Sequence, residues 1–412
     1  MTEKPKKAHP FVMMLKPVGS LCNMKCSFCY YLKPEANLNP RMSYELLEIF
    51  IRQYIEASPG PVLSFTWHGG EPSLAGLDFY RRAVELQKKY LPEGWTCWNN
   101  LQTNGLLLDH DFCSFLKEEN FDLGLSVDGT IEIHDKHRKD NRGLGTYEKV
   151  LSIVELLKSH GIKPDILCTV NSDTVKRPLD VYNALKKLDT HWIQFIPIVN
   201  YVNGEISSHS VKGIDYGNFL CKIFDHWLTQ DLDSLDVQLF AESLRVAAGF
   251  PASLCWMSNV CGRALILEKD GSIYSCDHYV REDYKLGNIF DKHLAEMADS
   301  DFQIKFGDGK KNDLHEQCRS CPNLKLCNGG CPKDRSSSGL NYLCEGYMRF
   351  FSHALPALEH VVSLRSQGFS SADIMGNINA QLKNIWKGIG RNDPCPCGSG
   401  LKAKNCCWDL QH

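Results

Sequence analysis

The sequence lacks long apolar runs and an excess of charge of either sign. Its 412 residues include 46 Lys or Arg and 49 Asp or Glu, which gives a formal net charge of −3. No stretch approaches the roughly 18 apolar residues that a membrane-spanning helix needs. Acidic and basic residues are interspersed, which argues against a nucleic-acid or membrane surface. We therefore expect a globular protein without nucleic-acid or membrane partners.

An export signal is also missing from the sequence. The N-terminal segment MTEKPKKAHPFVMML is basic, but its apolar run is short and no A-x-A-like cleavage site follows it. We therefore expect a cytoplasmic protein. The hydrophobic fraction of 43% is ordinary and allows a sizeable core, and the length is sufficient for two or three domains.

Cysteine is the residue present in excess, at 19 of 412 positions. One explanation is a disulfide framework, which needs an oxidising compartment and usually occurs in small secreted domains. The count is odd, however, and most of the cysteines cluster at spacings typical of metal ligands. The pattern therefore favours metal ligation over disulfides.

Extended apolar runs alternate with amphipathic helical runs between residue 10 and about residue 200. The candidate strands are Phe11–Lys16, Val62–His68, Thr96–Gln102, Leu123–Asp128, Ile166–Val170 and Trp192–Ile198. Helices are expected between them, for example at Ser43–Ala57, with Ser43 as N-cap, and at Thr146–His160, before Gly161. This alternation, at roughly 30-residue spacing, predicts an α/β fold with a parallel sheet, specifically a partial (β/α)6 TIM barrel. Chemistry in such barrels lies at the C-terminal strand ends.

The pattern changes near residue 240, where cysteines, glycines and short hairpin signals replace the strand–helix alternation. Lys269–Ser272 has the sequence of a hairpin turn. Helical character resumes from Gly346 to Leu364, and a polar segment then leads to a short module at Gly388–Trp408. We predict a barrel at 1–240, a cysteine-rich domain at 241–370, and a linker with a small tail module at 371–412.

Cys22, Cys26 and Cys29 form a C-x3-C-x2-C motif directly after the first candidate strand. Three thiolates from one loop can hold three irons of a [4Fe–4S] cluster and leave the fourth iron open for a small ligand. The alternative is a structural zinc site, for which His9 is a weak candidate as fourth ligand. The spacing favours the iron–sulfur cluster.

The segment Cys22-Asn-Met-Lys-Cys26-Ser-Phe28-Cys29 resembles the C-x3-C-x-Φ-C signature of the radical S-adenosylmethionine (SAM) superfamily. The resemblance covers residues 11 to about 200 and implies SAM as a cofactor. The SAM-binding residues that it implies are Phe28, Gly70 and Glu71 in Gly69-Gly70-Glu71-Pro72, Ser126 at the ribose, Arg138 at the carboxylate and Val199 near the adenine. The glycines also let the backbone approach a ligand closely. Thr103-Asn104-Gly105 is expected to line the pocket, whereas Arg138 could alternatively be a solvated helix charge.

Eight later cysteines form a second series of candidate ligands: Cys255, Cys261, Cys276, Cys318, Cys321, Cys327, Cys331 and Cys344. Eight thiolates are enough for two fully ligated [4Fe–4S] clusters. Two four-thiolate zinc sites are the alternative, because C-x2-C pairs also suit zinc. The C-x2-C-x5-C-x3-C run that begins at Cys318 is unusual for zinc ribbons and favours iron–sulfur clusters.

This series resembles the SPASM extension of radical SAM enzymes, and the resemblance implies how the ligands are shared. Cys255, Cys261, Cys276 and Cys331 would hold the cluster nearer the active site, and Cys318, Cys321, Cys327 and Cys344 would hold the outer one. Full ligation implies electron transfer rather than substrate capture. With the first motif, the chain is expected to carry three [4Fe–4S] clusters.

Asp277 directly follows Cys276, within Cys276-Asp-His-Tyr-Val280. A carboxylate there is suitably placed to take a proton near the active site, although a loop aspartate bound to backbone groups is the alternative. Within the eight-cysteine frame, this segment resembles the anaerobic sulfatase-maturating enzymes over about residues 11–350. The resemblance implies that Asp277 is the base and that a cysteine or serine of a sulfatase becomes Cα-formylglycine.

The same resemblance implies a radical mechanism and its partners. SAM would supply a 5′-deoxyadenosyl radical that takes a hydrogen from Cβ, and the surplus electron would leave through the auxiliary clusters. The expected partners are an unfolded or nascent sulfatase with a C/S-x-P-x-R motif and a flavodoxin- or ferredoxin-like reductant. One alternative is another SPASM peptide maturase, which forms a thioether or carbon–carbon crosslink. Another is a non-catalytic iron–sulfur electron carrier, which the SAM-binding motifs argue against.

The C-terminal segment from Arg391 to Cys407 resembles the SEC-C zinc motif. Its four cysteines can close a tetrahedral zinc site, so one zinc is expected; they are Cys395, Cys397, Cys406 and Cys407. A free cysteine-rich tail is the alternative. The remaining cysteines, Cys97, Cys113, Cys168 and Cys221, are interpreted as ordinary small apolar residues.

Overall fold

The computed structural model describes residues 7–31, 41–202, 204–396, 402–405 and 408. The chain divides into two compact units. The first unit consists of Met1–Val127, Ile131–Leu167 and Asn259–Asp313, and the second of Asp128–Thr130, Cys168–Ser258 and Leu314–His412. The first unit therefore combines the N-terminal half of the chain with a segment from its C-terminal half.

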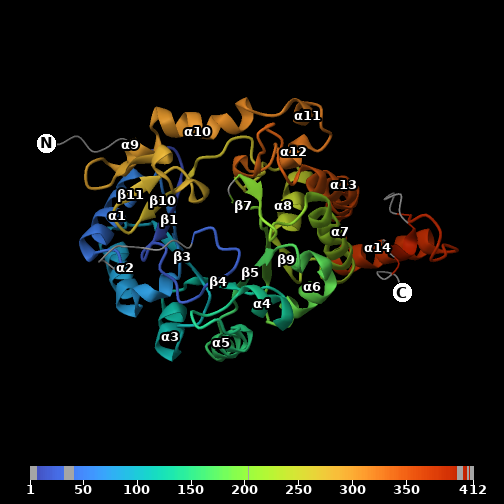
Figure 1. Cartoon of the computed structure of the whole chain (residues 1–412), viewed down its shortest axis with the longest axis horizontal. Helices are drawn as coiled ribbons and strands as arrows, with labels where there is room; N and C mark the ends of the chain where they lie inside the picture. Colours follow the sequence, from blue (N-terminus) through green and yellow to red (C-terminus); the bar gives the residue numbers. More distant parts are fainter. Residues whose placement is uncertain (1–6, 32–40, 203, 397–401, 406–407, 409–412) are drawn as a thin grey trace. The chain divides into compact units, whose positions relative to one another are not determined.

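The first unit is built on a sheet of mainly parallel strands (Figure 1). Its strands are β1 (Val12–Lys16), β2 (Val62–Trp67), β3 (Thr96–Thr103), β4 (Asp122–Ser126), the first half of β5 (Asp165–Val170), β10 (Ala264–Glu268), β11 (Ser272–Tyr274) and β12 (Lys285–Asn288). Neighbouring strands from β10 through β1, β2, β3 and β4 to β5 run parallel, whereas β11 and β12 are antiparallel additions. The predicted α/β class with a parallel sheet is confirmed.

Helices follow the strands of the first unit as the alternation predicted. They are α1 (Tyr44–Ala57), α2 (Leu77–Tyr90), α3 (His110–Glu118), α4 (Ile131–His137) and α5 (Tyr147–Ser159). The unit also contains α9 (Leu294–Ala298) and α10 (Asp301–Asn312), which lie outside the range of the predicted alternation. Ser43 caps α1 by accepting a hydrogen bond from the Leu46 amide, as expected. Helix α5 begins within one residue of its predicted start. The Asp135 carboxylate accepts hydrogen bonds there from the amides of Thr146 and Tyr147.

An aromatic core lies between the sheet and helices α1 and α2 of the first unit. Rings of Phe50, Tyr54, Phe65 and Trp67 contact one another in stacked or edge-to-face pairs at 5.1–6.3 Å between centroids. All four side chains are buried. The apolar positions that the sequence places on one face of α1 therefore anchor this helix to strand β2.

The strand β10 comes from a segment that the sequence analysis assigned to the cysteine-rich region. It pairs in parallel with β1 along its whole length, from Val12↔Ala264 to Lys16↔Glu268. The predicted hairpin turn at Lys269–Ser272 is present, since β10 and β11 are antiparallel neighbours joined there and Gly271 has a φ of 88°. The hairpin brings residues 276 and 277 close to the C-terminal end of β1.

The second unit is mainly helical. It contains α6 (Pro178–Lys186), β6 (Trp192–Pro197), β7 (Tyr201–Val202), β8 (Glu205–Ile206), α7 (Gly213–Gln230), β9 (Asp236–Val237), α8 (Gln238–Ala247), α11 (Glu316–Arg319), α12 (Leu324–Cys327), α13 (Cys344–Ser366) and α14 (Ser371–Trp386). The predicted sixth strand is present as β6, which runs parallel to β9. Within the described ranges, none of the helices combines the length and hydropathy of a membrane-spanning segment.

Helices α7 and α13 of the second unit approach each other closely at three glycines. A Cβ atom added to Gly346 would lie 2.0 Å from the Gly213 carbonyl oxygen, and one added to Gly217 would lie 2.6 Å from the Gly346 carbonyl oxygen. Only glycine permits this backbone contact. The crossing fixes α13 within its first turn, two residues after its first residue, Cys344.

We predict that Gly346→Ala destabilises the second unit, because the added methyl group must push α7 and α13 apart. The free energy of unfolding should fall by about 1–3 kcal/mol, the usual cost of overpacking. Denaturant unfolding under anaerobic conditions measures the change. The matched control is Gly376→Ala in α14, where no described heavy atom lies within 4 Å of the added Cβ. This variant should gain about 0.5–1 kcal/mol, and equal destabilisation of both variants would contradict the packing argument.

Candidate active site

The loop after β1 carries Cys22, Cys26 and Cys29, and Cys26 and Cys29 lie near enough to Cys22 for their charges to act on it. Burial, together with the negative charges of Glu71, Cys26 and Cys29, raises the pKa of Cys22 to about 12. The Cys29 amide also donates to the Cys26 carbonyl at 3.1 Å. Three soft thiol ligands thus share one loop, which is the donor set that an iron–sulfur cluster requires.

The chain after α4 holds this cysteine loop in place. The Lys25 amide donates to the Lys139 carbonyl at 2.8 Å, and the Ser27 amide donates to the His137 carbonyl at 3.0 Å. The Ser27 hydroxyl also contacts His137 Nδ1 at 2.9 Å. The residues on both sides of Cys26 are therefore held by backbone hydrogen bonds.

The Gly69-Gly70-Glu71-Pro72 segment packs directly against the same loop. A Cβ atom on Gly70 would lie 2.1 Å from the Leu21 carbonyl oxygen. The Gly70 amide donates to the Gly19 carbonyl and the Glu71 amide to the Leu21 carbonyl, both at 2.8 Å. The sequence indicated that glycine allows close approach to a ligand. The structure shows a close approach to the chain's own backbone.

Glu71 connects the ends of β2 and β3. Its carboxylate is 1% exposed and accepts hydrogen bonds from the Ser73 amide and hydroxyl at 3.0 and 2.6 Å, from the Thr103 hydroxyl at 2.6 Å and from the Asn104 amide at 2.8 Å. Burial raises the pKa of Glu71 above its ordinary value, although these donors oppose the shift. Asn104 in turn donates to Asn23 in the cysteine loop at 2.8 Å. Three successive strand ends are thereby joined.

Arg138 lies against the aromatic residue of the cysteine motif. Its guanidinium carbon is 5.3 Å from the centroid of the Phe28 ring, and the side chain is 7% exposed. Arg138 is therefore not the solvated helix charge that the sequence allowed as an alternative. Ser126 is the last residue of β4 and is half-buried, at the strand end where the sequence predicted chemistry.

Asp277 follows strand β11, and its carboxylate lies close to Lys16 at the end of β1. Each of the two carboxylate oxygens has a partner in the first unit. The buried ammonium of Lys16 forms an ion pair with Oδ1, and the Tyr30 hydroxyl donates to Oδ2. Burial alone would raise the pKa of Asp277, but the positive charge of Lys16, with a contribution from His278, outweighs burial and holds the pKa well below its ordinary value. The carboxylate is therefore ionised at neutral pH.

The predicted ligands of the inner auxiliary cluster belong to both units. Cys261 and Cys276 are in the first unit, and Cys255 and Cys331 are in the second. Burial raises the pKa of Cys331 to about 12, and the charges of Asp334 and Cys255 contribute to this shift. Ligation of a cluster by these four residues stays a prediction.

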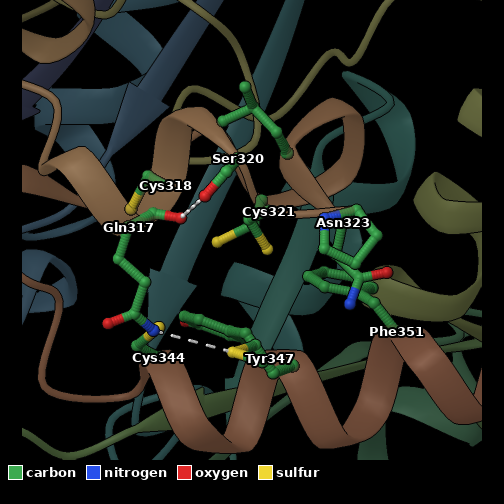
Figure 2. A pocket seen from close by; sticks show the side chains of 13 residues that line it. Gln317, Cys318, Ser320, Cys321, Asn323, Cys344, Tyr347 and Phe351 are labelled. Carbon is green, nitrogen blue, oxygen red and sulfur yellow. Dashed lines mark hydrogen bonds between the residues drawn. The ribbon is translucent and has the colours of Figure 1, made fainter.

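The four predicted ligands of the outer cluster line one cavity of about 220 Å³ in the second unit (Figure 2). Cys318 and Cys321 come from α11 and the turn after it, Cys327 ends α12, and Cys344 begins α13. Burial raises the pKa of Cys344 to about 11, and the charges of Cys318 and Cys321 add to the shift. The four cysteines that the SPASM resemblance assigned to the outer cluster thus line the same cavity, together with mainly apolar groups.

Among the described residues, no three His, Cys, Asp or Glu side chains converge closely enough to hold a single metal ion. A [4Fe–4S] cluster distributes its thiolates over different irons, so its ligands surround a cage rather than one point. The cavity lined by Cys318, Cys321, Cys327 and Cys344 fits that arrangement better than a mononuclear zinc site.

Two further predictions concern residues of the second unit. Val199 follows β6 in the second unit and is buried, and its contact with adenine stays a prediction. In the tail, Cys395 is buried, whereas Cys397, Cys406 and Cys407 lie outside the described residues. The described part of the tail includes a contact between the Trp386 and Trp408 rings at 6.1 Å.

The sequence analysis missed Lys16, Tyr30 and His68 as site residues. Burial lowers the pKa of His68, so this imidazole is neutral at pH 7 despite the nearby Asp277 charge. One signal was available: Lys16 ends the otherwise apolar strand Val12–Lys16 just before the cysteine motif. A lysine at the buried end of a barrel strand is uncommon unless it is paired.

Comparisons with known proteins extend these observations. Residues 17–185 match the radical SAM superfamily, residues 255–322 match an iron–sulfur cluster-binding domain (SPASM), and residues 391–409 match the SEC-C motif. The serine-type anaerobic sulfatase-maturating enzyme of Bacteroides thetaiotaomicron is 42% identical over 395 residues, which is 89% of this chain and 95% of that protein. The cysteine-type enzyme of Clostridium perfringens is 36% identical over 86% of this chain and 99% of that protein.

Solved structures agree with the sequence relatives. A structure described as native anSMEcpe with bound AdoMet superposes with a TM-score of 0.80 at 35% identity, covering 86% of this chain and 99% of that chain. A structure of Streptococcus suis SuiB bound to S-adenosylmethionine superposes with a TM-score of 0.57 at 15% identity, covering 80% and 76%. The second comparison shows a shared fold only.

We predict that Glu71→Gln weakens both the loop and SAM binding. The glutamine amide must face either the Ser73 or the Asn104 backbone N–H, so two donors oppose each other in either orientation. This should cost about 1–3 kcal/mol of unfolding free energy and raise the dissociation constant of SAM. Anaerobic equilibrium binding and denaturant unfolding measure the two effects. Glu85→Gln on the exposed side of α2 is the control, and equal behaviour of the two variants would contradict this role of Glu71.

Proposed function

The chain belongs to the anaerobic sulfatase-maturating enzymes of the radical SAM superfamily, and on this basis we propose that it oxidises a cysteine or serine of a sulfatase to Cα-formylglycine. One observation carries the proposal: relatives of both the serine and the cysteine type match almost the whole chain rather than the radical SAM domain alone. The two relatives cover 89% and 86% of it. We therefore assign both residue types as candidate substrates.

SAM and iron–sulfur clusters are the cofactors that the matched domains imply. Cys22, Cys26 and Cys29 would hold the cluster that binds SAM, and the two later groups of four cysteines would hold two auxiliary clusters. When bound, SAM and the first cluster supply the 5′-deoxyadenosyl radical that abstracts a Cβ hydrogen from the substrate residue. The position of the three cysteines on one loop, where the charges of Cys26 and Cys29 act on Cys22, supports this assignment.

The surrounding residues of the first unit prepare the site. Glu71 and Gly70 fix the cysteine loop against the ends of β2 and β3. Arg138 presents a buried cation beside Phe28, where a carboxylate such as that of SAM would find a partner. Because these groups are ordered by the protein's own hydrogen bonds, little reorganisation is needed when the cofactor binds.

Asp277 is the residue to which we assign the proton transfer. Loss of the Cβ hydrogen leaves a carbon radical beside an S–H or O–H group, and removal of that proton makes the radical a much stronger reductant. The Asp277 carboxylate directly follows Cys276, a predicted cluster ligand, so proton acceptor and electron acceptor are neighbours in the chain. A general base of this kind typically contributes about 10²–10⁴-fold in rate.

The partners follow from the proposed reaction. The solved relative with a bound Cp18Cys peptide supports a peptide segment as substrate. We assign an unfolded or nascent sulfatase with a C/S-x-P-x-R motif, because the target side chain must enter a site built among strand ends. A flavodoxin- or ferredoxin-like protein is the proposed reductant, and the cytoplasm is the proposed location, since its thiols stay reduced.

The function is tested by anaerobic reconstitution of the full chain with iron and sulfide, followed by incubation with SAM, a reductant and a C/S-x-P-x-R peptide. A serine peptide should lose about 2 Da through oxidation, and a cysteine peptide about 18 Da through oxidation and exchange of sulfur for oxygen. Mass spectrometry measures both changes.

The negative control is the triple variant Cys22→Ala, Cys26→Ala, Cys29→Ala, which should not cleave SAM. A peptide crosslink without any aldehyde from the unmodified chain would overturn the proposed function. Aldehyde formation by the triple variant would overturn the assignment of the first cluster.

We also propose that the tail binds one zinc ion. The match of residues 391–409 to the SEC-C motif supports this, as does the burial of Cys395 in the described part of the tail. Two cysteine pairs within so short a segment provide four thiolates, and a unit of this size folds more readily around a metal.

We predict that deletion of residues 389–412 removes about one zinc per chain and leaves the iron content unchanged. Elemental analysis of the purified protein measures both metals. Turnover of a short peptide should continue, because helices α13 and α14 separate the deleted residues from the last predicted cluster ligand, Cys344. Loss of iron in parallel with zinc would contradict the separation of the two metal sites.

A further inference from the structure

Lys16 is a fully buried lysine at the C-terminal end of β1. Its side chain is 0% exposed, and it follows the buried residues Met13 and Leu15 of the same strand. An ammonium group that is removed from water without a partner costs several kcal/mol, so such a lysine persists only where other groups stabilise its charge. The groups around it therefore indicate what the charge does.

Two groups face the ammonium directly. Nζ forms an ion pair with Asp277 Oδ1 and lies 3.4 Å from the centroid of the Tyr31 ring. Among the described residues, neither Nζ nor Oδ1 has a well-aligned hydrogen-bond partner, so the attraction between them is chiefly ionic. The ring of Tyr31 covers another side of the cation. Lys16 is thus the cation paired with this oxygen of Asp277.

The second oxygen of Asp277 is held from a different segment. The Tyr30 hydroxyl donates to Oδ2, and the Tyr31 hydroxyl donates to Glu268, the β10 residue paired in register with Lys16. The carboxylate is therefore fixed between the end of β1 and the residues just after the cysteine motif. A carboxylate that is held at both oxygens cannot rotate freely.

His68 does not compete with Lys16 for this role. Its Nδ1 accepts the Gly69 amide at 2.7 Å, which places the ring proton on Nε2, and its lowered pKa keeps it neutral. Glu268 is the other carboxylate near the ammonium, but its described hydrogen bond comes from Tyr31. The Lys16 charge is thus directed to Asp277.

We propose that Lys16 is a positioning residue for the oxidation: its buried ammonium holds the Asp277 carboxylate in one orientation, which keeps hydrogen abstraction coupled to deprotonation. This inference rests on the proposed function, in which Asp277 accepts the substrate proton. Without Lys16 the carboxylate loses its ionic partner and can turn away. SAM cleavage then continues, but fewer cleavage events lead to aldehyde.

The experiment compares the full reconstituted chain with Lys16→Met, Asp277→Asn and the double variant. Lys16→Met keeps the length and apolar stem of the side chain and removes the charge. For each protein, iron content, 5′-deoxyadenosine and formylglycine are measured at saturating peptide. We expect Lys16→Met to keep its iron and to make 5′-deoxyadenosine, while formylglycine falls by about 10²-fold, the loss typical of a catalytic group misplaced by about 1 Å.

The double variant separates positioning from general damage. If Lys16 acts through Asp277, adding Lys16→Met to Asp277→Asn should change the ratio of 5′-deoxyadenosine to formylglycine no further, because the two residues form one unit. Multiplicative effects of the two substitutions would overturn the proposal. Glu268→Gln, which removes the other nearby carboxylate charge, is the matched control and should keep the wild-type ratio. Loss of coupling in this control equal to that in Lys16→Met would also overturn it.

A further variant covers the case in which Lys16→Met fails to acquire its clusters. Lys16→Gln can still donate a neutral hydrogen bond to Asp277 but carries no charge. Its ratio of 5′-deoxyadenosine to formylglycine should lie between those of the wild type and Asp277→Asn, and a wild-type ratio would overturn the proposal. Failure of the proposed function is distinguishable, because the wild-type chain would then make no aldehyde at all.

Discussion

The parallel register of the first unit's sheet is the constraint on which the site depends. Parallel strands present their carboxyl ends at one edge, so loops that follow β1, β2 and β3 meet there regardless of their separation in sequence. The cysteine motif, the glycine segment and Asn104 come from these three loops. Strand β10 adds a fourth strand end beside β1. Asp277 follows the next strand, β11, and pairs with Lys16 at the end of β1.

Two carboxylates at this edge, that of the buried Glu71 and that of the half-buried Asp277, are stabilised in different ways. Glu71 receives neutral hydrogen bonds from three residues, which satisfy it within the protein and join the loops. Asp277 is held by a cation and a hydroxyl, and its pKa is lowered whereas that of Glu71 is raised. Pairs of acidic groups whose environments shift their pKa values in opposite directions commonly serve different roles. Here Glu71 is suited to holding the loops together, and Asp277 is suited to accepting a proton.

The sequence predicted the elements that have local signals. Apolar runs and caps located the six parallel strands and helices such as α1, and cysteine spacing located the candidate cluster ligands. It could not locate β10, because a five-residue apolar run carries no information about a partner strand about 250 residues earlier. The sequence likewise could not give the detailed roles of Lys16 and Glu71. Their roles depend on which donors and charges surround them, and residue type alone does not state this.

The late position of β10 has a consequence for synthesis of the chain. Strand β1 can pair with β2 early, but its other edge stays open until Glu268 has been made. At about 5–20 residues per second, the ribosome takes roughly 10–50 s to cover that interval. During this time an apolar strand edge is available to other nascent chains, and such edges promote aggregation. Slow translation or crowded polysomes should therefore be more harmful to this protein than its final structure, in which β1 is paired on both sides, would indicate.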